Sequence, residues 1–175
     1  MTAMADERRV LGIDPGSVRT GFGIIAVDGV RSRYVASGVI QAGRGAFAER
    51  LHTIFTSLAA VIAEHGPTES AVEEVFVNRN VQSALKLGQA RGAAICACAS
   101  AGLAVDEYSA RAVKQALVGR GGADKDQVGY MVRTILTLKG DLREDAADAL
   151  AVALTHVQHD RLTAQLAGQS RGGAT

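Results

Sequence analysis

The first forty residues carry the hydrophobic pattern of β-strands. Three apolar residues lead into Asp14, and a Pro-Gly pair follows. Proline cannot donate a hydrogen bond to a strand ladder and glycine tolerates positive φ, so the first strand is expected to end at this carboxylate. Two more strands are expected at 21–27 and 30–41, joined by a tight turn at Asp28-Gly29. The pattern therefore predicts three consecutive antiparallel strands.

Helical spacing begins near residue 46. Apolar side chains recur every three or four positions over 46–64, and a short β-rich segment with Glu73 inside it follows at 70–77. A helix between two strands favours a parallel crossover, which would place this fourth strand beside the first and Glu73 close to Asp14. The remaining elements expected are a helix at 81–101, a strand at 103–107, and helices at 110–118, 125–138 and 144–158.

These elements indicate one domain of the α/β class. A chain of 175 residues is long enough for a single hydrophobic core. We expect a five-stranded mixed sheet, its first three strands antiparallel, flanked by α-helices. Residues 1–8 are expected to form a flexible lead-in, 9–158 the single domain, and 159–175 a disordered tail.

The distribution of charge is more informative than its total. The formal net charge is only +1, which does not by itself indicate a nucleic-acid-binding protein. Residues 76–143, however, contain ten basic and five acidic side chains. This excess fits a basic face for a polyanion, and it fits a solvated mixed surface equally well.

Membrane and secreted classes are disfavoured. The longest apolar stretch, 93–105, is interrupted by Ser100 and Gly102 and is shorter than the ~20 residues that a membrane span needs. No apolar signal region precedes the first strand. Cys96 and Cys98 lack a zinc-binding partner set, which favours reduced core cysteines. The expected location is cytoplasmic, with no membrane partner.

Two acidic residues lie in the first turn of the last predicted helix. Asp145 and Asp148 are three positions apart, so they are neighbours on one helix face. Such a pair is common near a helix N-terminus, where the helix dipole offsets its repulsion, and alone it does not indicate a site. We expect His156, two turns further on, to be a surface residue.

Together with Asp14 and Glu73, the helical pair would place four carboxylates in one site. They cannot all ionise in a pocket of low dielectric without cations. Mg²⁺ prefers oxygen ligands together with water and phosphate. Two such ions about 3.5–4 Å apart can activate a water and stabilise the leaving oxygen of a displacement at phosphorus. The residues therefore indicate metal-assisted phosphodiester hydrolysis.

Four segments resemble one protein family in their order and spacing. The segments GIDPGSVRTGFG, AVEEVF, SALKLGQARG and DAADALAVA are similar to the RuvC Holliday-junction resolvases, and the likeness extends over residues 10–156. The resemblance implies an RNase H-like fold and two Mg²⁺ ions per subunit, with Mn²⁺ able to substitute. The catalytic, metal-binding acids that it implies are Asp14, Glu73, Asp145 and Asp148.

The resemblance also implies an activity and partners. The protein would be a structure-selective endonuclease that resolves four-way DNA junctions in recombination and repair, by paired symmetric nicks that leave 5′-phosphate and 3′-hydroxyl ends. The family acts as a homodimer and works with a branch-migration helicase complex of the RuvA-RuvB type. In the helix at 81–101, Gly88 and Gly92 would form a packing face against the sheet or a second subunit, which makes this helix our candidate dimer interface. The roles of Gln89 and Arg91 stay open between close packing and a DNA contact.

Five further residues are candidates for DNA contact. Phe76 matches a family residue near the junction centre and would stack on a base, although a phenylalanine at a strand end is also typical of a core. Lys114 and Lys125 match basic residues near the scissile phosphate, and would otherwise be solvated helix lysines. Arg79 and Asn80, in the same loop as Phe76, would touch backbone phosphate.

Two other functions stay open at this point. A catalytically inactive module that binds junction DNA could share the fold, although all four acids are present. An actin-like or sugar-kinase-type ATPase fragment would begin with a similar Asp-x-Gly turn, but it needs a second phosphate loop that is missing after Glu73. Junction binding without nicking would support the first alternative, and ATP turnover without DNA would support the second.

Overall fold

A single five-stranded sheet forms the centre of the computed structural model, which describes residues 7–76 and 80–172, with side chains as far as residue 168. Its order is β3-β2-β1-β4-β5. The strands are β1 (Arg8–Asp14), β2 (Arg19–Asp28), β3 (Arg31–Gln41), β4 (Glu69–Glu73) and β5 (Val105–Tyr108). The first three pair antiparallel, whereas β4 pairs parallel with both β1 and β5. The predicted mixed sheet is confirmed, including the crossover that brings β4 beside β1.

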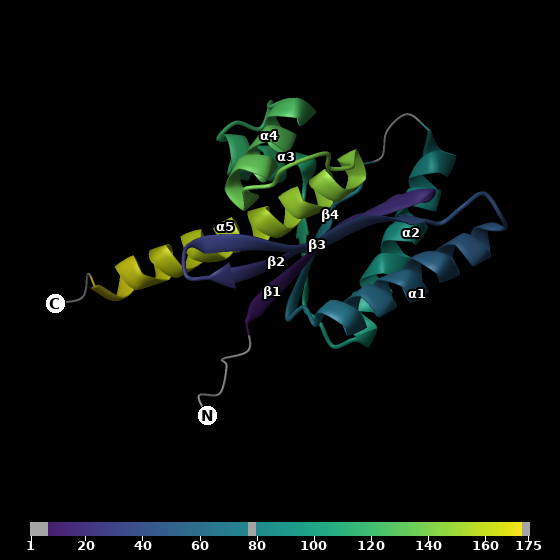
Figure 1. Cartoon of the computed structure of the whole chain (residues 1–175), viewed down its shortest axis with the longest axis horizontal. Helices are drawn as coiled ribbons and strands as arrows, with labels where there is room; N and C mark the ends of the chain where they lie inside the picture. Colours follow the sequence, from purple (N-terminus) through teal and green to yellow (C-terminus); the bar gives the residue numbers. More distant parts are fainter. Residues whose placement is uncertain (1–6, 77–79, 173–175) are drawn as a thin grey trace.

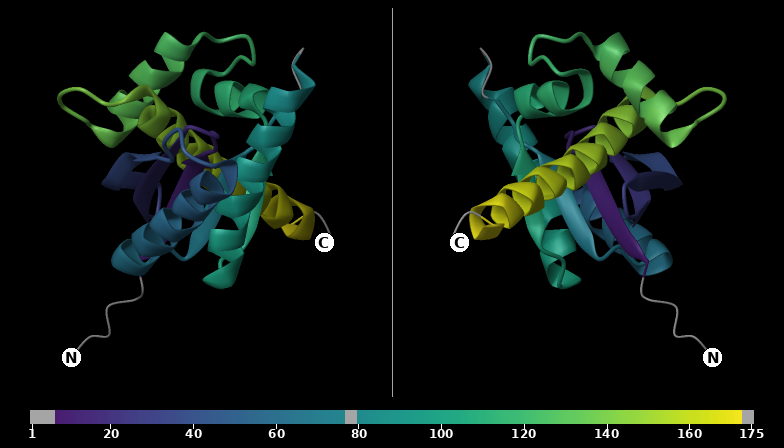
Figure 2. Two further views of the ribbon diagram at one scale, coloured as in Figure 1. Left: turned by 90° about the vertical axis from the view of Figure 1, so that its right-hand side faces the viewer. Right: turned by 90° about the vertical axis from the view of Figure 1, so that its left-hand side faces the viewer.

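Helices cover both faces of this sheet. They are α1 (Phe47–His65), α2 (Val81–Ser100), α3 (Ala110–Val118), α4 (Lys125–Leu136) and α5 (Glu144–Gly172). Figures 1 and 2 show α1 and α2 on one face and α3, α4 and α5 on the other. Successive strand residues point to opposite faces, so Val10 packs toward α5 while Leu11 packs toward α1 and α2. Burial on both faces explains the continuous apolar run at the start of the chain.

Helix α5 lies directly against β1 and β2 because glycines face it. A Cβ added at Gly21 would lie 1.9 Å from the Asp145 carbonyl oxygen, and one added at Gly12 would lie 2.0 Å from the Ala149 carbonyl oxygen. Any residue larger than glycine would push the helix away. The first turns of α5 are thereby seated beside the strand end that carries Asp14.

Several strand boundaries differ from the prediction, and two of the differences bear on the hairpin turn and the acids. Asp28 pairs with Arg31, so the hairpin turn is Gly29-Val30, one residue later than expected. Gly29 has a φ of 54°, a conformation that glycine adopts readily in such a turn. Strand β4 is shorter than predicted and ends at Glu73, which puts this carboxylate at a strand end.

Helix α5 continues to Gly172, whereas a helix ending near 158 and a disordered tail at 159–175 were expected. The segment after 158 contains no proline and is rich in alanine, leucine, glutamine and arginine, which favour helix. Extending an existing helix requires no new nucleus, so moderate propensity is sufficient. Figure 1 shows these last turns projecting away from the sheet. Across the described residues, none of the helices combines the length and the apolar character needed to cross a bilayer.

Candidate active site

Two of the predicted acids come from neighbouring strands. Asp14 is the last residue of β1, and Glu73 is the last residue of β4. The strands are parallel, with Ile13 paired to Val72, so both carboxylates lie at the same end of the sheet. The two carboxyls are close enough that each affects the pKa of the other. The predicted juxtaposition of the strand-end acids is therefore present.

A cleft of about 320 Å³ opens at this end of the sheet, and its polar lining consists of Asp14, Glu73, Lys114, Lys125 and Asp148. Asp145, one turn earlier on α5 than Asp148, lies beside the cleft and not in its lining. Its Oδ2 is 3.2 Å from Nε of Arg19. The charge of Asp145 nevertheless acts on both Asp14 and Asp148. Three of the four predicted acids thus share one lining, with the fourth next to it.

Positive charge is scarce around these acids. Burial, followed by the charge of Glu73, raises the pKa of Asp14 from 3.8 to about 8. Burial also raises the pKa of Asp148, although Nζ of Lys125 lies 3.2 Å from its Oδ2. Glu144 shares that lysine at 2.8 Å, and its hydrogen bond holds the pKa of Lys125 above the usual value. Burial of this kind disfavours the ionised carboxyl, and a bound cation would favour it.

The donor set fits a hard divalent cation. Asp14, Glu73 and Asp148 present carboxylate oxygens to one cleft, and burial, with a smaller contribution from neighbouring acids, raises the pKa values of all three. Oxygen ligands of this kind suit Mg²⁺ or Mn²⁺. These acids, with Asp145 beside them, are the residues that could hold a metal in this cleft.

The lysines and the phenylalanine proposed for DNA contact surround the acids. Lys114 and Lys125 line the same cleft as the acids, which favours a phosphate-binding role over that of ordinary solvated lysines. Phe76 is 77% exposed in the loop after β4, so the alternative of a core phenylalanine is wrong. An exposed ring next to a cleft that contains two lysines is suited to stacking on a base.

The loop between β4 and α2 contains the other two candidates. Asn80 caps α2, because its side-chain oxygen accepts a hydrogen bond from the Ser83 backbone N–H at 3.1 Å. Its side-chain amide group is the part that could still donate to a phosphate. Arg79 lies outside the described residues, and its contact with DNA stays a prediction.

Arg91 supports the strand end that carries Glu73. Its Nε donates to the Glu73 carbonyl oxygen at 3.3 Å, and its guanidinium group pairs with Glu107 at 2.5 Å. The side chain is only 20% exposed. The motif SALKLGQARG pointed to this arginine, but its partners come from two strands that the motif does not contain. Of the two roles left open for it, the structure favours close packing.

The chain is similar to known proteins over most of its length. A family model described as Crossover junction endodeoxyribonuclease RuvC matches residues 10–156. The RuvC protein of Alkalilimnicola ehrlichii is 53% identical over 158 residues, which cover 90% of this chain and 96% of that relative. The RuvC protein of Acidiphilium cryptum is 56% identical over 152 residues, which cover 86% of this chain and 91% of that relative.

Solved structures give the same result. Thermus thermophilus RuvC in complex with Holliday junction substrate superposes with a TM-score of 0.84 at 39% identity, covering 89% of this chain and 96% of that chain. The yeast mitochondrial Holliday junction resolvase Ydc2 has a TM-score of 0.66 at 10% identity, covering 90% of this chain and 80% of that chain. This likeness shows the fold alone. The match over nearly the whole of its folded part shows that this chain belongs to the RuvC family of crossover junction endodeoxyribonucleases.

Proposed function

We propose that this protein resolves four-way DNA junctions by Mg²⁺-dependent hydrolysis, with paired symmetric nicks that leave 5′-phosphate and 3′-hydroxyl ends. The observation that carries the proposal is the cleft in which Asp14, Glu73 and Asp148 face Lys114 and Lys125. Carboxylates short of positive charge, beside lysines able to bind phosphate, fit metal-assisted cleavage of a phosphodiester. The names of the relatives and the Thermus complex support junction DNA as the substrate.

Each side chain of the cleft has a proposed task. The three lining acids, together with Asp145, would hold two Mg²⁺ ions, and Mn²⁺ could replace them. The bound ions would supply an activated water and stabilise the leaving oxygen. Lys114 and Lys125 would hold the phosphate of the strand to be cut. Phe76 would stack on a base opened at the junction centre.

A homodimer is part of this proposal. On α2, Val81 and Leu85 are 65% and 64% exposed. A Cβ added at Gly88 or Gly92 would meet nothing within 4 Å, so this glycine face does not pack against the sheet. A second subunit covering the face would bring two identical sites to a substrate of nearly two-fold symmetry.

Two further expectations rest on the family. A branch-migration helicase complex of the RuvA-RuvB type is the proposed partner, because it would move the junction that this enzyme cuts. The proposed location is the cytoplasm, where free thiols such as those of Cys96 and Cys98 persist.

Cleavage of labelled DNA tests the proposed activity. A four-way junction, a fork and a plain duplex are incubated with the protein in Mg²⁺ and in EDTA. We expect symmetric, ligatable nicks on the junction, only in Mg²⁺, and none on the other substrates. Tight junction binding without nicking would support the inactive binding module, and ATP turnover without DNA would support the ATPase alternative.

A further inference from the structure

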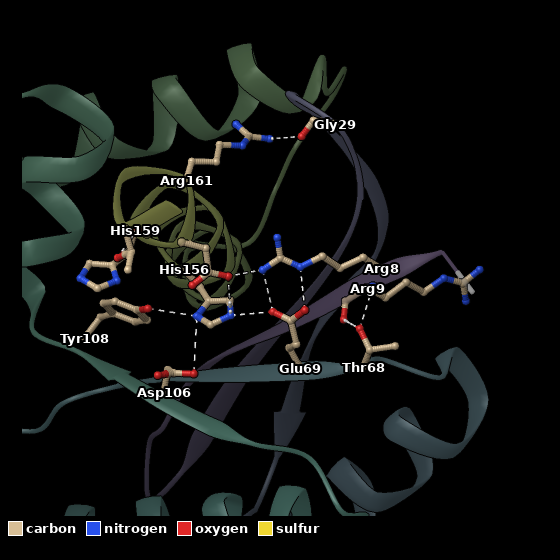
Figure 3. A network of polar contacts seen from close by, with 12 residues as sticks. Arg8, Arg9, Gly29, Thr68, Glu69, Asp106, Tyr108, His156, His159 and Arg161 are labelled. Atoms are coloured by element: carbon tan, nitrogen blue, oxygen red, sulfur yellow. Dashed lines mark hydrogen bonds and ion pairs between the residues drawn. The ribbon is translucent and has the colours of Figure 1, made fainter. Parts of the chain in front are cut away.

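A partly buried polar cluster lies toward the other end of the strands that carry the acids (Figure 3). At its centre is His156, which was expected on the surface but is only 3% exposed. Its Nε2 lies 2.8 Å from Oε2 of Glu69, and its Nδ1 lies 3.0 Å from the Tyr108 hydroxyl. Burial raises the pKa of Tyr108 to about 12, so the hydroxyl keeps its proton. Both ring nitrogens of His156 therefore have a hydrogen-bond partner.

Arg8 completes this cluster. Its Nε and one terminal nitrogen pair with the two oxygens of Glu69 at 2.6 and 2.7 Å, and the same terminal nitrogen pairs with Asp160. Glu69, His156 and Asp160 have the spacing of a metal site. The guanidinium group already supplies the positive charge at that point, and its hydrogen bonds lower the pKa of Glu69. The cluster is therefore a closed polar contact between elements.

Each of three elements in this cluster also carries a site acid. Strand β1 contributes Arg8 and ends at Asp14, and β4 contributes Glu69 and ends at Glu73. Helix α5 contributes His156, which lies two turns after Asp148. A fourth element, β5, contributes a tyrosine whose backbone pairs in register with Glu73. His156 thus joins α5 both to the strand of Glu73 and to the residue beside Glu73.

The rest of the contact between α5 and the sheet is largely apolar. Gly12 lies against Ala149 and Ala153, and Gly23 lies against Leu150. Apolar contacts of this kind seat the helix on the sheet, but they are not directional. Hydrogen bonds from a buried histidine are directional and costly to leave unmade.

We propose that His156 is a positioning residue that sets the position of the acids on α5 relative to Glu73, and thereby the affinity of the site for its metal ions. The inference rests on the proposed function, because it assumes that these acids bind metal. Misplacement of a catalytic group by about 1 Å can lower a rate by about 10²-fold, so a small shift of α5 would be measurable. His156 lies two turns from Asp148 on α5, so it would act on the metal site only through the position of the helix.

Metal binding and folding stability are measured separately to test this. The variants are His156→Ala, His156→Gln, which keeps a donor toward Glu69, and Tyr108→Phe, which removes one hydroxyl. Mn²⁺ affinity is measured by calorimetry, and Mg²⁺ dependence by cleavage of a four-way junction. We expect His156→Ala to weaken Mn²⁺ binding and raise the Mg²⁺ concentration for half-maximal cleavage by about tenfold, as for other groups that orient metal ligands.

The milder variants keep the test valid if His156→Ala does not fold. His156→Gln should restore most of the metal affinity, and Tyr108→Phe should lose part of it. His159→Ala on the exposed side of α5 is the positional control, since His159 contacts the Tyr108 ring edge-on without a hydrogen bond to Glu69. Val132→Ala in the core on α4 is the stability control, because it should lower the unfolding temperature without changing Mn²⁺ affinity.

The outcomes separate this inference from the proposed function. Unchanged Mn²⁺ affinity in folded His156 and Tyr108 variants, or an equal loss in Val132→Ala, would overturn the positioning role while wild-type cleavage stands. A wild-type protein that neither binds Mn²⁺ nor cuts junctions would overturn the proposed function. In the Asp14→Asn variant the heat of Mn²⁺ binding measured by calorimetry should disappear. That loss would assign the Mn²⁺ binding of the wild-type protein to the cleft. Mn²⁺ binding that persists there but is lost in His156→Ala would place the ion at the histidine and overturn the inference.

Discussion

At the scale of single residues, the cleft combines several acids with few compensating charges. Lys125 is shared between Asp148 and Glu144, and the largest electrostatic influences on Asp14 are other carboxylates. An arrangement of this kind is unfavourable in the metal-free protein and favourable once cations bind. Removing one acid should therefore relieve repulsion and remove a ligand at the same time.

Neutral substitutions of the acids test this directly. Asp14→Asn, Glu73→Gln, Asp145→Asn and Asp148→Asn should each lower cleavage by about 10³-fold, a loss of several kcal/mol of transition-state stabilisation, while junction binding survives. Single-turnover cleavage and mobility-shift titration measure the two effects. Arg31→Ala, at the exposed start of β3, is the control. An acid variant that nicks at the wild-type rate would remove that residue from the ligand set.

The raised pKa of Asp14 makes metal-free stability depend on pH. The folded-state value of about 8 lies above the ordinary 3.8, so the folded state binds the proton more tightly than the unfolded state. The resulting stabilisation is complete below about pH 4 and is lost as the pH rises toward about 8. Mg²⁺ competes with the same protons, so the rise in unfolding temperature that it causes should grow across this range.

Thermal unfolding in EDTA and in Mg²⁺, from about pH 5 to about pH 9, measures both trends. The Asp14→Asn variant serves as the comparison, because it cannot titrate at this position and its metal-free curve should be flatter. A Mg²⁺ effect of the same size at every pH would contradict the competition between protons and metal.

At the scale of elements, the closest approach in the fold is that of α5 to the first two strands. Glycines on the strands, not complementary large side chains, permit it, and the acids of α5 depend on this approach to reach the strand-end acids. Arg91 makes a comparable contribution from α2, because it holds the end of β4 through the Glu73 carbonyl. The positions of the acids are therefore set by contacts of the elements that carry them.

Substitution of one of these glycines tests the seating of α5. Gly21→Ala should lower the free energy of unfolding by about 1–3 kcal/mol, as overpacking does elsewhere, and should lower cleavage as well. The reason is that the added Cβ would lie 1.9 Å from the Asp145 carbonyl oxygen. The control is Gly168→Ala, on α5, where an added Cβ meets nothing within 4 Å. This variant should leave the free energy of unfolding unchanged or slightly higher. Wild-type stability and cleavage in Gly21→Ala would contradict the close seating.

At the scale of the whole molecule, the two faces of the sheet differ in what covers them and in what they leave exposed. The face covered by α3, α4 and α5 provides most of the cleft, and the face covered by α1 and α2 presents the uncovered glycine surface of α2. The exposed Val81 and Leu85 extend that surface. This division suits a protein that uses one side for chemistry and another for assembly.

The dimer gives a prediction at this scale. Gly92→Arg should convert a dimer into a monomer in sedimentation at micromolar concentration, because a long charged side chain would occupy the face that the partner covers. Cleavage should then yield single unpaired nicks. Gln165→Arg, on the exposed part of α5, is the matched control and should remain dimeric. A wild-type protein that sediments as a monomer would contradict the dimer itself.

Much of the fold was predictable because its signals are local. Ser109 and Asp124, residue types that favour helix N-caps, accept hydrogen bonds from the backbones of α3 and α4. The end of β1 follows from the Pro-Gly pair after Asp14. The extension of α5 was missed because its glycines and polar residues suggested disorder, although helix propensity after residue 158 was adequate.

The order of strands and helices and the four candidate acids can be recognised in the sequence alone, because periodicity, caps and breakers act within a few residues. Which side chains meet depends on the tertiary structure. His156 is buried because Glu69 and Tyr108, 87 and 48 positions away, come to its two ring nitrogens. Arg91 acquires its role in the same way, through the strands that α2 crosses. A hydrophobic pattern records that a helix face is buried, but the partner of a polar group depends on packing between elements distant in the chain.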